Sequence, residues 1–134
     1  MSPVSGLAEV VLWAHDIDRS LAFYGDLLGL EVISPPGMAN RFLRAGAAGE
    51  GIPSMVVLIQ HPDPGGSFPG EKRLRPLHHL ALSVAPPGYE DLVSRLRGAA
   101  VEIRDGTHPV LEGVRTFYVD DPDGNEVEII SPSG

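Results

Sequence analysis

Two short segments of the chain alternate between hydrophobic and polar positions, and they lie about seventy residues apart. They are LAEVVLWA at 7–14 and LHHLALSV at 77–84. Alternation with a period of two is typical of a β-strand whose two faces meet different surroundings. We therefore expect a strand at each segment, with one apolar face packed under a helix. His78 falls on the apolar face of the second strand and is expected to pack or cap there.

A helical pattern follows each of these strands. In the first half Asp18 is the expected N-cap and Gly29 the expected stop. In the second half Pro86 and Pro87 open the helix and Gly98 ends it. The apolar stripes expected to face the sheets are Leu21, Tyr24, Leu27 and Leu28 in the first helix, and Leu92, Val93 and Leu96 in the second.

Three further strand candidates complete each half. They are 31–34, 41–45 and 54–60 in the first half, and 101–104, 114–120 and 126–130 in the second, with 45–51 read as a flexible turn. The sequence thus predicts an α+β fold of two βαβββ modules, at about 6–60 and 77–131, joined by a linker at 61–76 rich in proline and glycine. We expect a pseudo-twofold relation between the modules, with curled sheets that enclose a cleft.

Alignment of the two halves places polar residues at equivalent, inward-facing positions. Glu9 matches His79 at an offset of seventy, and Glu128 matches Val57 at an offset of seventy-one. Two carboxylates and one imidazole in a cleft predict a divalent-metal site with open coordination positions. This donor set favours Mn²⁺, Fe²⁺, Ni²⁺, Co²⁺ or Zn²⁺ over Ca²⁺. The other interpretation of each residue is structural: a solvated strand glutamate, a histidine bonded to a carbonyl, or a glutamate paired with arginine.

Composition narrows the class of protein. The 134 residues fit one domain, and no cysteine is present for disulfides or zinc-thiolate sites. A formal net charge of −8 argues against nucleic-acid binding, which needs a basic surface. We see no signal peptide and no apolar run long enough to span a membrane, so we expect a cytoplasmic protein.

Three stretches resemble the vicinal oxygen chelate superfamily, the group of glyoxalases, bleomycin resistance proteins and extradiol dioxygenases. They are DIDRSLAFYGDLLGLEV, LHHLALSV and VRTFYVDDPDGNEVEII, and the resemblance covers about 6–131. It implies that Glu9, His79, Val57 and Glu128 occupy the positions of the family's metal ligands. Glu9 stands where most metal-binding relatives have His or Gln. Val57 removes the fourth ligand of the glyoxalase I isomerases, which leaves an open, dioxygenase-like set of three.

Five further residues are candidates for substrate binding. Trp13 and Ser83 share the inward faces, although core packing explains them equally well. Arg41 and Arg115 lie on the third strands, where a guanidinium binds a carboxylate with two hydrogen bonds or forms a surface ion pair. His108 lies in a loop expected at the cleft rim.

Three functions remain open at this point. The first is a metal-dependent enzyme acting on a small oxygenated substrate, with dioxygenase, lyase, isomerase or epimerase chemistry and with Glu128 and Glu9 as catalytic groups. The second is a metal-free protein that binds a small antibiotic-like molecule, for which the acidic charge suits a cationic ligand. The third, a protein-interaction module, has no positive support. The resemblance and the open sheet edges also imply a homodimer.

Overall fold

The structure is a computed structural model of the chain and describes residues 2–133. It divides into two compact units, Met1–Ser67 and Phe68–Gly134, and the boundary lies inside the predicted linker. Each unit contains one four-stranded mixed sheet in the order strand, helix, strand, strand, strand. The α+β class and the two βαβββ modules are therefore confirmed, while the curled sheets and the enclosed cleft stay predictions.

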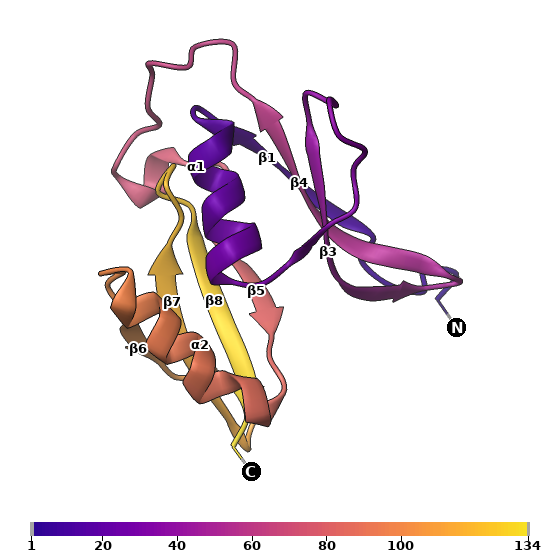
Figure 1. Cartoon of the computed structure of the whole chain (residues 1–134). Coiled ribbons are helices and arrows are strands. Elements are labelled where there is room, and N and C mark those ends of the chain that lie inside the picture. The colour runs from indigo at the N-terminus through magenta and orange to yellow at the C-terminus, as the bar shows by residue number, and fades with distance from the viewer. Residues whose placement is uncertain (1, 134) are drawn as a thin grey trace. The chain divides into compact units, whose positions relative to one another are not determined.

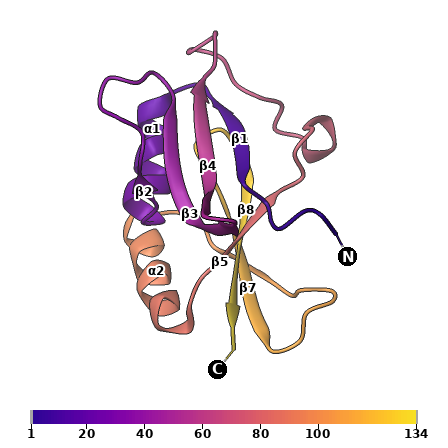
Figure 2. The same ribbon diagram turned by 90° about the vertical axis from the view of Figure 1, so that its right-hand side faces the viewer.

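The sheet of the first unit has the strand order β1-β4-β3-β2. Its strands are β1 (Glu9–Ala14), β2 (Glu31–Val32), β3 (Arg41–Gly49) and β4 (Ile52–Gln60). β1 runs parallel to β4, and Figure 2 shows β1, β4 and β3 side by side. Along β1, Leu12 and Ala14 are buried whereas Val11 and Trp13 are exposed, which confirms the predicted alternation.

The helix of the first unit begins two residues earlier than predicted. Asp16 has an extended backbone, and its Oδ1 accepts a hydrogen bond from the Arg19 N–H at 3.2 Å, so Asp16 and not Asp18 is the N-cap. α1 (Ile17–Leu21) then continues as a π-helical segment, Ala22–Leu27. In this wider turn both Phe23 and Tyr24 are buried, although only Tyr24 belonged to the predicted stripe. The chain leaves the helix at Gly29, whose φ of 81° matches the predicted stop.

The segment 45–51 is part of a long hairpin, not the flexible turn that its composition suggested. β3 continues to Gly49 and β4 begins at Ile52. The pairing of the two strands shifts between Arg44 and Gly46, and again between Ala47 and Gly49. These irregularities are β-bulges, where glycine supplies backbone angles closed to other residues. The prediction was wrong here because bulges interrupt the two-residue alternation of a strand.

The sheet of the second unit has the equivalent order β5-β8-β7-β6. Its strands are β5 (Leu80–Ser83), β6 (Arg104–Gly106), β7 (Val114–Asp120) and β8 (Glu126–Pro132). β5 begins three residues later than the predicted segment at 77–84, so His78 and His79 precede the strand. β6 also begins later, because Val101 still bonds back to the Leu96 carbonyl at 3.0 Å as the chain leaves the helix.

One face of the second sheet is covered by α2 (Pro86–Gly98), as predicted (Figure 1). The helix buries Leu92, Val93 and Leu96, and its Tyr89 ring meets the Phe117 ring at 5.5 Å. Phe117 therefore lies on the helix side of β7. Because side chains alternate along a strand, Tyr118 lies on the opposite, helix-free face.

The strand registers confirm the alignment of the two halves. Val57 is the partner of Val11 across β4 and β1, and Glu128 is the partner of Ala81 across β8 and β5. Val57 and Glu128 thus hold equivalent places in the two modules. No helix among the described residues is both long and apolar enough to cross a membrane.

Candidate functional site

A row of polar side chains crosses the helix-free face of the second sheet. Tyr118 on β7 is the partner of both Arg104 on β6 and Glu128 on β8, and Glu128 is the partner of Ala81 on β5. Paired residues project from the same face of a sheet, so these side chains gather there. The face expected to bear the site is therefore the one that α2 leaves open.

Glu128 is the most unusual residue of this face. It is only 4% exposed, although a carboxylate normally stays in water. Its Oε1 lies 3.2 Å from Nε2 of His79. Its Oε2 is buried and has no hydrogen-bond partner among the described residues. An unpartnered buried charged oxygen is costly, so the surroundings fit a carboxylate that serves a ligand rather than the fold.

The pair His79 and Glu128 fits a divalent metal. Two donors bound to one ion at about 2.1 Å lie roughly 3 Å apart, close to the observed separation of Nε2 and Oε1. The other ring nitrogen of His79 lies 2.7 Å from Nδ1 of His78. A metal-ligating histidine usually donates its second N–H to a neighbour in this way, which fixes the ring and its tautomer. Nitrogen and carboxylate donors suit Zn²⁺, Mn²⁺, Fe²⁺, Co²⁺ and Ni²⁺.

Tyr118 supports the same pair. Burial, together with the adjacent and hydrogen-bonded Glu128 carboxylate, raises the pKa of the Tyr118 phenol above its usual value. A phenol is already a protonated donor at neutral pH, and this rise extends that state to higher pH. Its ring also lies 5.9 Å from that of His79. Tyr118 was not among the residues expected at the site, yet a hairpin closed at DPDGN, with Asp120 opposite Glu126, places Tyr118 opposite Glu128.

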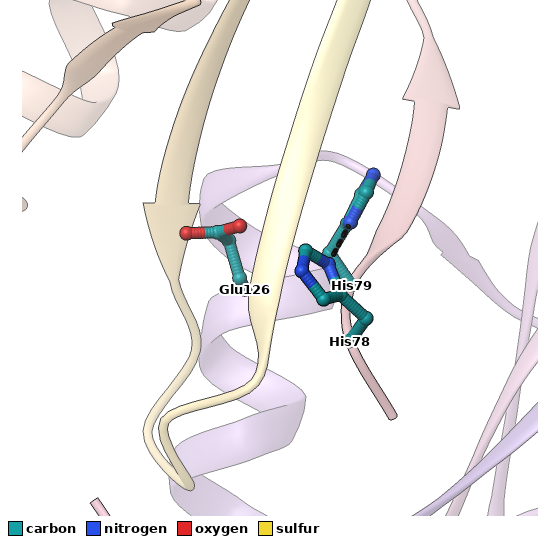
Figure 3. A group of neighbouring side chains, drawn as sticks. All are labelled: His78, His79 and Glu126. Carbon is teal, nitrogen blue, oxygen red and sulfur yellow. Dashed lines mark hydrogen bonds between the residues drawn. The ribbon is translucent and has the colours of Figure 1, made fainter. Parts of the chain in front are cut away.

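His78, His79 and Glu126 form a second group of possible ligands. One donor atom from each lies within 4.8 Å of the others. Figure 3 shows both imidazoles just before β5 and the Glu126 carboxylate on β8. His78 is exposed and bonded to His79, which corrects its predicted place on the apolar face. The prediction extended the strand alternation to residues that lie outside the strand.

Glu126 is held by cations rather than free for a metal. Lys72 donates to its Oε1, and Arg104 Nη2 lies 3.1 Å from its Oε2. Burial alone acts to raise the pKa of Glu126, but the hydrogen bonds from Lys72 and Arg104 outweigh it, so the pKa lies below its usual value. Glu126 is thus a charged member of an ion-pair network.

The first unit contains Glu9 and Trp13, on one face of β1. Glu9 is exposed at the start of the strand, and the Trp13 side chain is 51% exposed, with its ring 5.4 Å from that of His61. Because Glu9 belongs to a different unit from His79 and Glu128, its place beside them stays a prediction.

The other candidates lie in separate surroundings. Ser83 is exposed on the same face of β5 as Ala81, next to the row of Glu128. Arg41 donates to the Met38 and Ala39 carbonyls of its own loop. Arg115 lies on the α2 side, with its guanidinium 3.7 Å from the Tyr89 ring and 3.2 Å from Glu90. His108 accepts hydrogen bonds from the Val110 and Leu111 N–H groups of its loop. Within the second unit, Ser83 thus shares the face of Glu128, whereas Arg115 lies on the opposite side.

Comparison with known proteins places the chain in a family. The model of the Glyoxalase/Bleomycin resistance protein/Dioxygenase superfamily matches residues 6–129. A search of the curated proteins found no match. Among solved structures, a glyoxalase/dioxygenase from Nostoc punctiforme is 22% identical with a TM-score of 0.76, covering 98% of this chain and 95% of its own.

Two other similar structures carry different functions. A lactoylglutathione lyase from Agrobacterium tumefaciens is 21% identical with a TM-score of 0.65, over 97% of this chain and 96% of its own. An antibiotic binding protein from Streptomyces, TnmS3, is 22% identical with a TM-score of 0.61, over 99% and 100%. Such likenesses show the fold alone, but the family model spans nearly the whole chain. The chain belongs to the glyoxalase/bleomycin resistance protein/dioxygenase superfamily.

Proposed function

We propose that the protein is a metal-dependent enzyme acting on a small oxygenated substrate, with His79 and Glu128 as metal ligands. The observation that carries this proposal is the buried Oε2 of Glu128, which has no hydrogen-bond partner among residues 2–133. Beside it lies a histidine already oriented by His78. The superfamily includes metal-dependent lyases and dioxygenases, so the donor set agrees with the family.

The third ligand in this proposal is Glu9. Its support is its place in the repeat, two residues before Val11, which pairs with Val57 as Ala81 pairs with Glu128. Glu9 is exposed and so retains the freedom to act alternatively as a general base.

The roles of the protein groups follow from their contacts. When bound, a divalent metal supplies Lewis-acid stabilisation of negative charge on the substrate oxygens. His79 presents Nε2, and His78 fixes the tautomer through the Nδ1 contact. Tyr118 lies opposite Glu128 in the sheet, where its phenol can support the carboxylate. Ser83 offers a hydroxyl on the same face for orienting a substrate.

Metal titration of chelator-treated protein tests the proposal. We expect binding of one of Mn²⁺, Fe²⁺, Co²⁺, Ni²⁺ or Zn²⁺ at one ion per chain by calorimetry, weakened at least tenfold in Glu128→Gln and in His79→Gln. Glu102→Gln removes an exposed carboxylate and is the matched control. The same affinity in Glu128→Gln as in the parent protein refutes the assignment. Glu9→Gln weakens binding if Glu9 is a ligand and leaves it unchanged if Glu9 is only a base.

A second candidate function is metal-free binding of a small molecule. The observation in its favour is the pair Trp13 and Val11, which expose large apolar side chains on one face of β1. An aromatic surface in a protein of net charge −8 suits a cationic ligand. Thermal stabilisation by cationic aromatic compounds, lost in Trp13→Ala and with no effect of any divalent ion, would favour this function.

The homodimer is also part of our proposal, and light scattering tests it.

A further inference from the structure

A polar pocket of about 350 Å³ lies wholly within the second unit. Such a volume is at the small end of the range for ligand sites. Strands β6, β7 and β8 contribute to it, and so does the segment before β5, which follows the unit boundary. Its lining residues are Gly70, Lys72, Arg75, His78, Arg104, Asp120, Gly124 and Glu126.

The charge of this pocket is opposite in sign to that of the whole protein. Three cations, Lys72, Arg75 and Arg104, face two carboxylates, Asp120 and Glu126, so the lining carries a net charge of +1. The whole chain carries −8 and has only 10 basic residues. Three of those ten basic residues therefore line one small pocket. Solubility alone does not require basic side chains to cluster in this way.

Arg75 is the cation whose charge is left for a ligand. Its guanidinium donates to the Pro69 and Asp123 carbonyls, both at 2.8 Å, and to Asn125 Oδ1 at 3.1 Å. All three acceptors are uncharged, and no carboxylate pairs with Arg75 in the part of the chain that the structure describes. The bonds hold the guanidinium rigid without neutralising it, which is the arrangement that binds an oxyanion with little loss of entropy.

Gly124 lies close to this guanidinium with no side chain between them. A Cβ atom at Gly124 would lie 3.3 Å from Arg75 Nη1, so any side chain there would crowd the group. The backbone at Gly124 also has a φ of 80°, which disfavours other residues. The turn before β8 therefore brings its backbone close to Arg75, and both residues line the pocket.

The other two cations are fixed by their own partners. Arg104 Nη2 lies 2.8 Å from Asp120 Oδ1 and 3.1 Å from Glu126 Oε2. Lys72 donates to the other oxygen of Glu126. This chain of alternating charges orders a second part of the pocket lining and leaves donors of Lys72 and Arg104 for a bound anion.

The pocket adjoins the proposed metal ligands. His78 lines it, and His78 Nδ1 lies 2.7 Å from Nδ1 of His79. Glu126 precedes Glu128 by two residues on β8, so both side chains project from the same face. A substrate held at His79 and Glu128 would thus have the pocket beside one of its ends.

We propose that this pocket is an oxyanion subsite, and that the substrate carries a carboxylate or phosphate-type group bound there by Arg75 and Lys72. The assignment to the substrate rests on the proposed function, whereas the pocket itself does not. A metal ion at His78, His79 and Glu126 is the rival occupant, but it would lie among three positive side chains, which repel it.

Binding of inorganic phosphate and of acetate to chelator-treated protein tests the subsite. Both probes are titrated at constant ionic strength with chloride as the reference, and binding is followed by shifts of the arginine side-chain NMR signals. We expect saturable binding of at least one probe, weakened at least tenfold in Arg75→Gln. Tighter phosphate binding indicates a phosphate-type substrate, and tighter acetate binding a carboxylate.

Arg73→Gln is the matched control, because Arg73 is exposed in the same segment and pairs with Glu71 outside the pocket. Lys72→Gln keeps the hydrogen bonds of Arg75 intact and should weaken binding several-fold, so a misfolded Arg75→Gln does not decide the question. Equal weakening in Arg73→Gln, or saturable binding of neither probe, overturns the proposal. So does divalent-metal binding that survives Glu128→Gln but is lost in His78→Gln and in Glu126→Gln.

Glu128→Gln separates this inference from the proposed function. Anion binding that persists in this variant, while metal binding is lost, supports both. Anion binding without any metal binding in the parent protein refutes the metal proposal and retains the subsite. Loss of anion binding in Glu128→Gln places the anion away from Arg75 and overturns the subsite.

Discussion

Glu128 points one carboxylate oxygen at Nε2 of His79, at 3.2 Å, and buries the other without a hydrogen-bond partner among the described residues. The fold alone gains little from this arrangement, because the desolvation of an unpartnered charged oxygen opposes folding. A bound cation would remove that cost. The relationship therefore predicts opposite effects of one substitution with and without metal.

Glu128→Gln should raise the free energy of unfolding of the metal-free protein by about 1 kcal/mol, because a neutral amide is cheaper to bury. With saturating metal the order should reverse, since only the parent protein gains binding energy. Urea denaturation with and without chelator measures both. A Glu128→Gln variant that is less stable than the parent under chelation contradicts the account, and Glu102→Gln should differ little in either condition.

Tyr118→Phe should weaken metal binding about tenfold, the range typical for loss of a group that positions a ligand. Tyr118 is the cross-strand partner of Glu128, and its phenol is a protonated donor at neutral pH. Tyr89→Phe is the control, because Tyr89 lies on α2 and meets the other side of the sheet at Phe117. Equal affinities in the two variants would show that Tyr118 plays no positioning role. Isothermal calorimetry with the metal that binds the parent protein gives the comparison.

The Tyr89 phenol should titrate above its usual pKa of 10.0, chiefly because of burial, with Glu90 and Asp105 adding to the rise and Arg115 opposing it. Arg115→Gln should therefore raise this pKa further, and Glu90→Gln should lower it. NMR titration of ¹³Cζ-labelled tyrosine measures both, with Tyr89→Phe assigning the signal. A shift of the same sign in the two variants would contradict the electrostatic assignment.

The same shift fixes the direction of a pH effect on stability. A pKa that is raised in the folded state means that the folded protein holds the Tyr89 proton more tightly than the unfolded chain. The proton on Tyr89 therefore stabilises the folded protein. This stabilisation is fully present below the unfolded pKa near 10 and is lost as the pH rises through the pKa of the folded state. Between about pH 9 and pH 12, the range around that pKa, the free energy of unfolding of Tyr89→Phe should therefore fall less than that of the parent protein.

Asp16→Ala should destabilise the protein by about 1 kcal/mol, because it removes the side chain that caps the Arg19 N–H. Asp18→Ala removes only a favourable charge in the first turn of α1 and should cost about 0.5 kcal/mol or less. Chemical denaturation of the two variants ranks them. The reverse order would restore Asp18 as the cap.

Alternation and repetition by themselves determined the two modules, the faces of β1 and β8, and the equivalence of Val57 with Glu128. These features depend on local periodicity, which a strand imposes on its sequence wherever one face is buried. For the same reason β7 has the predicted bounds, Val114–Asp120. Where periodicity failed, as at the bulges near Gly46 or before Leu80, the predicted boundaries were wrong.

Only the tertiary structure decided what the polar side chains do. Lys72 and Arg75 lie in a segment without periodicity, and their positions depend on Glu126 and Asn125, some fifty residues further along the chain. His78 lies outside its predicted place because the strand starts late, at Leu80. Arg115 forms the ion pair with Glu90 that was the alternative to substrate binding, and its guanidinium also stacks on Tyr89. Local sequence patterns predict which face of a helix or strand is buried. Contacts between distant side chains depend on packing that no single segment encodes.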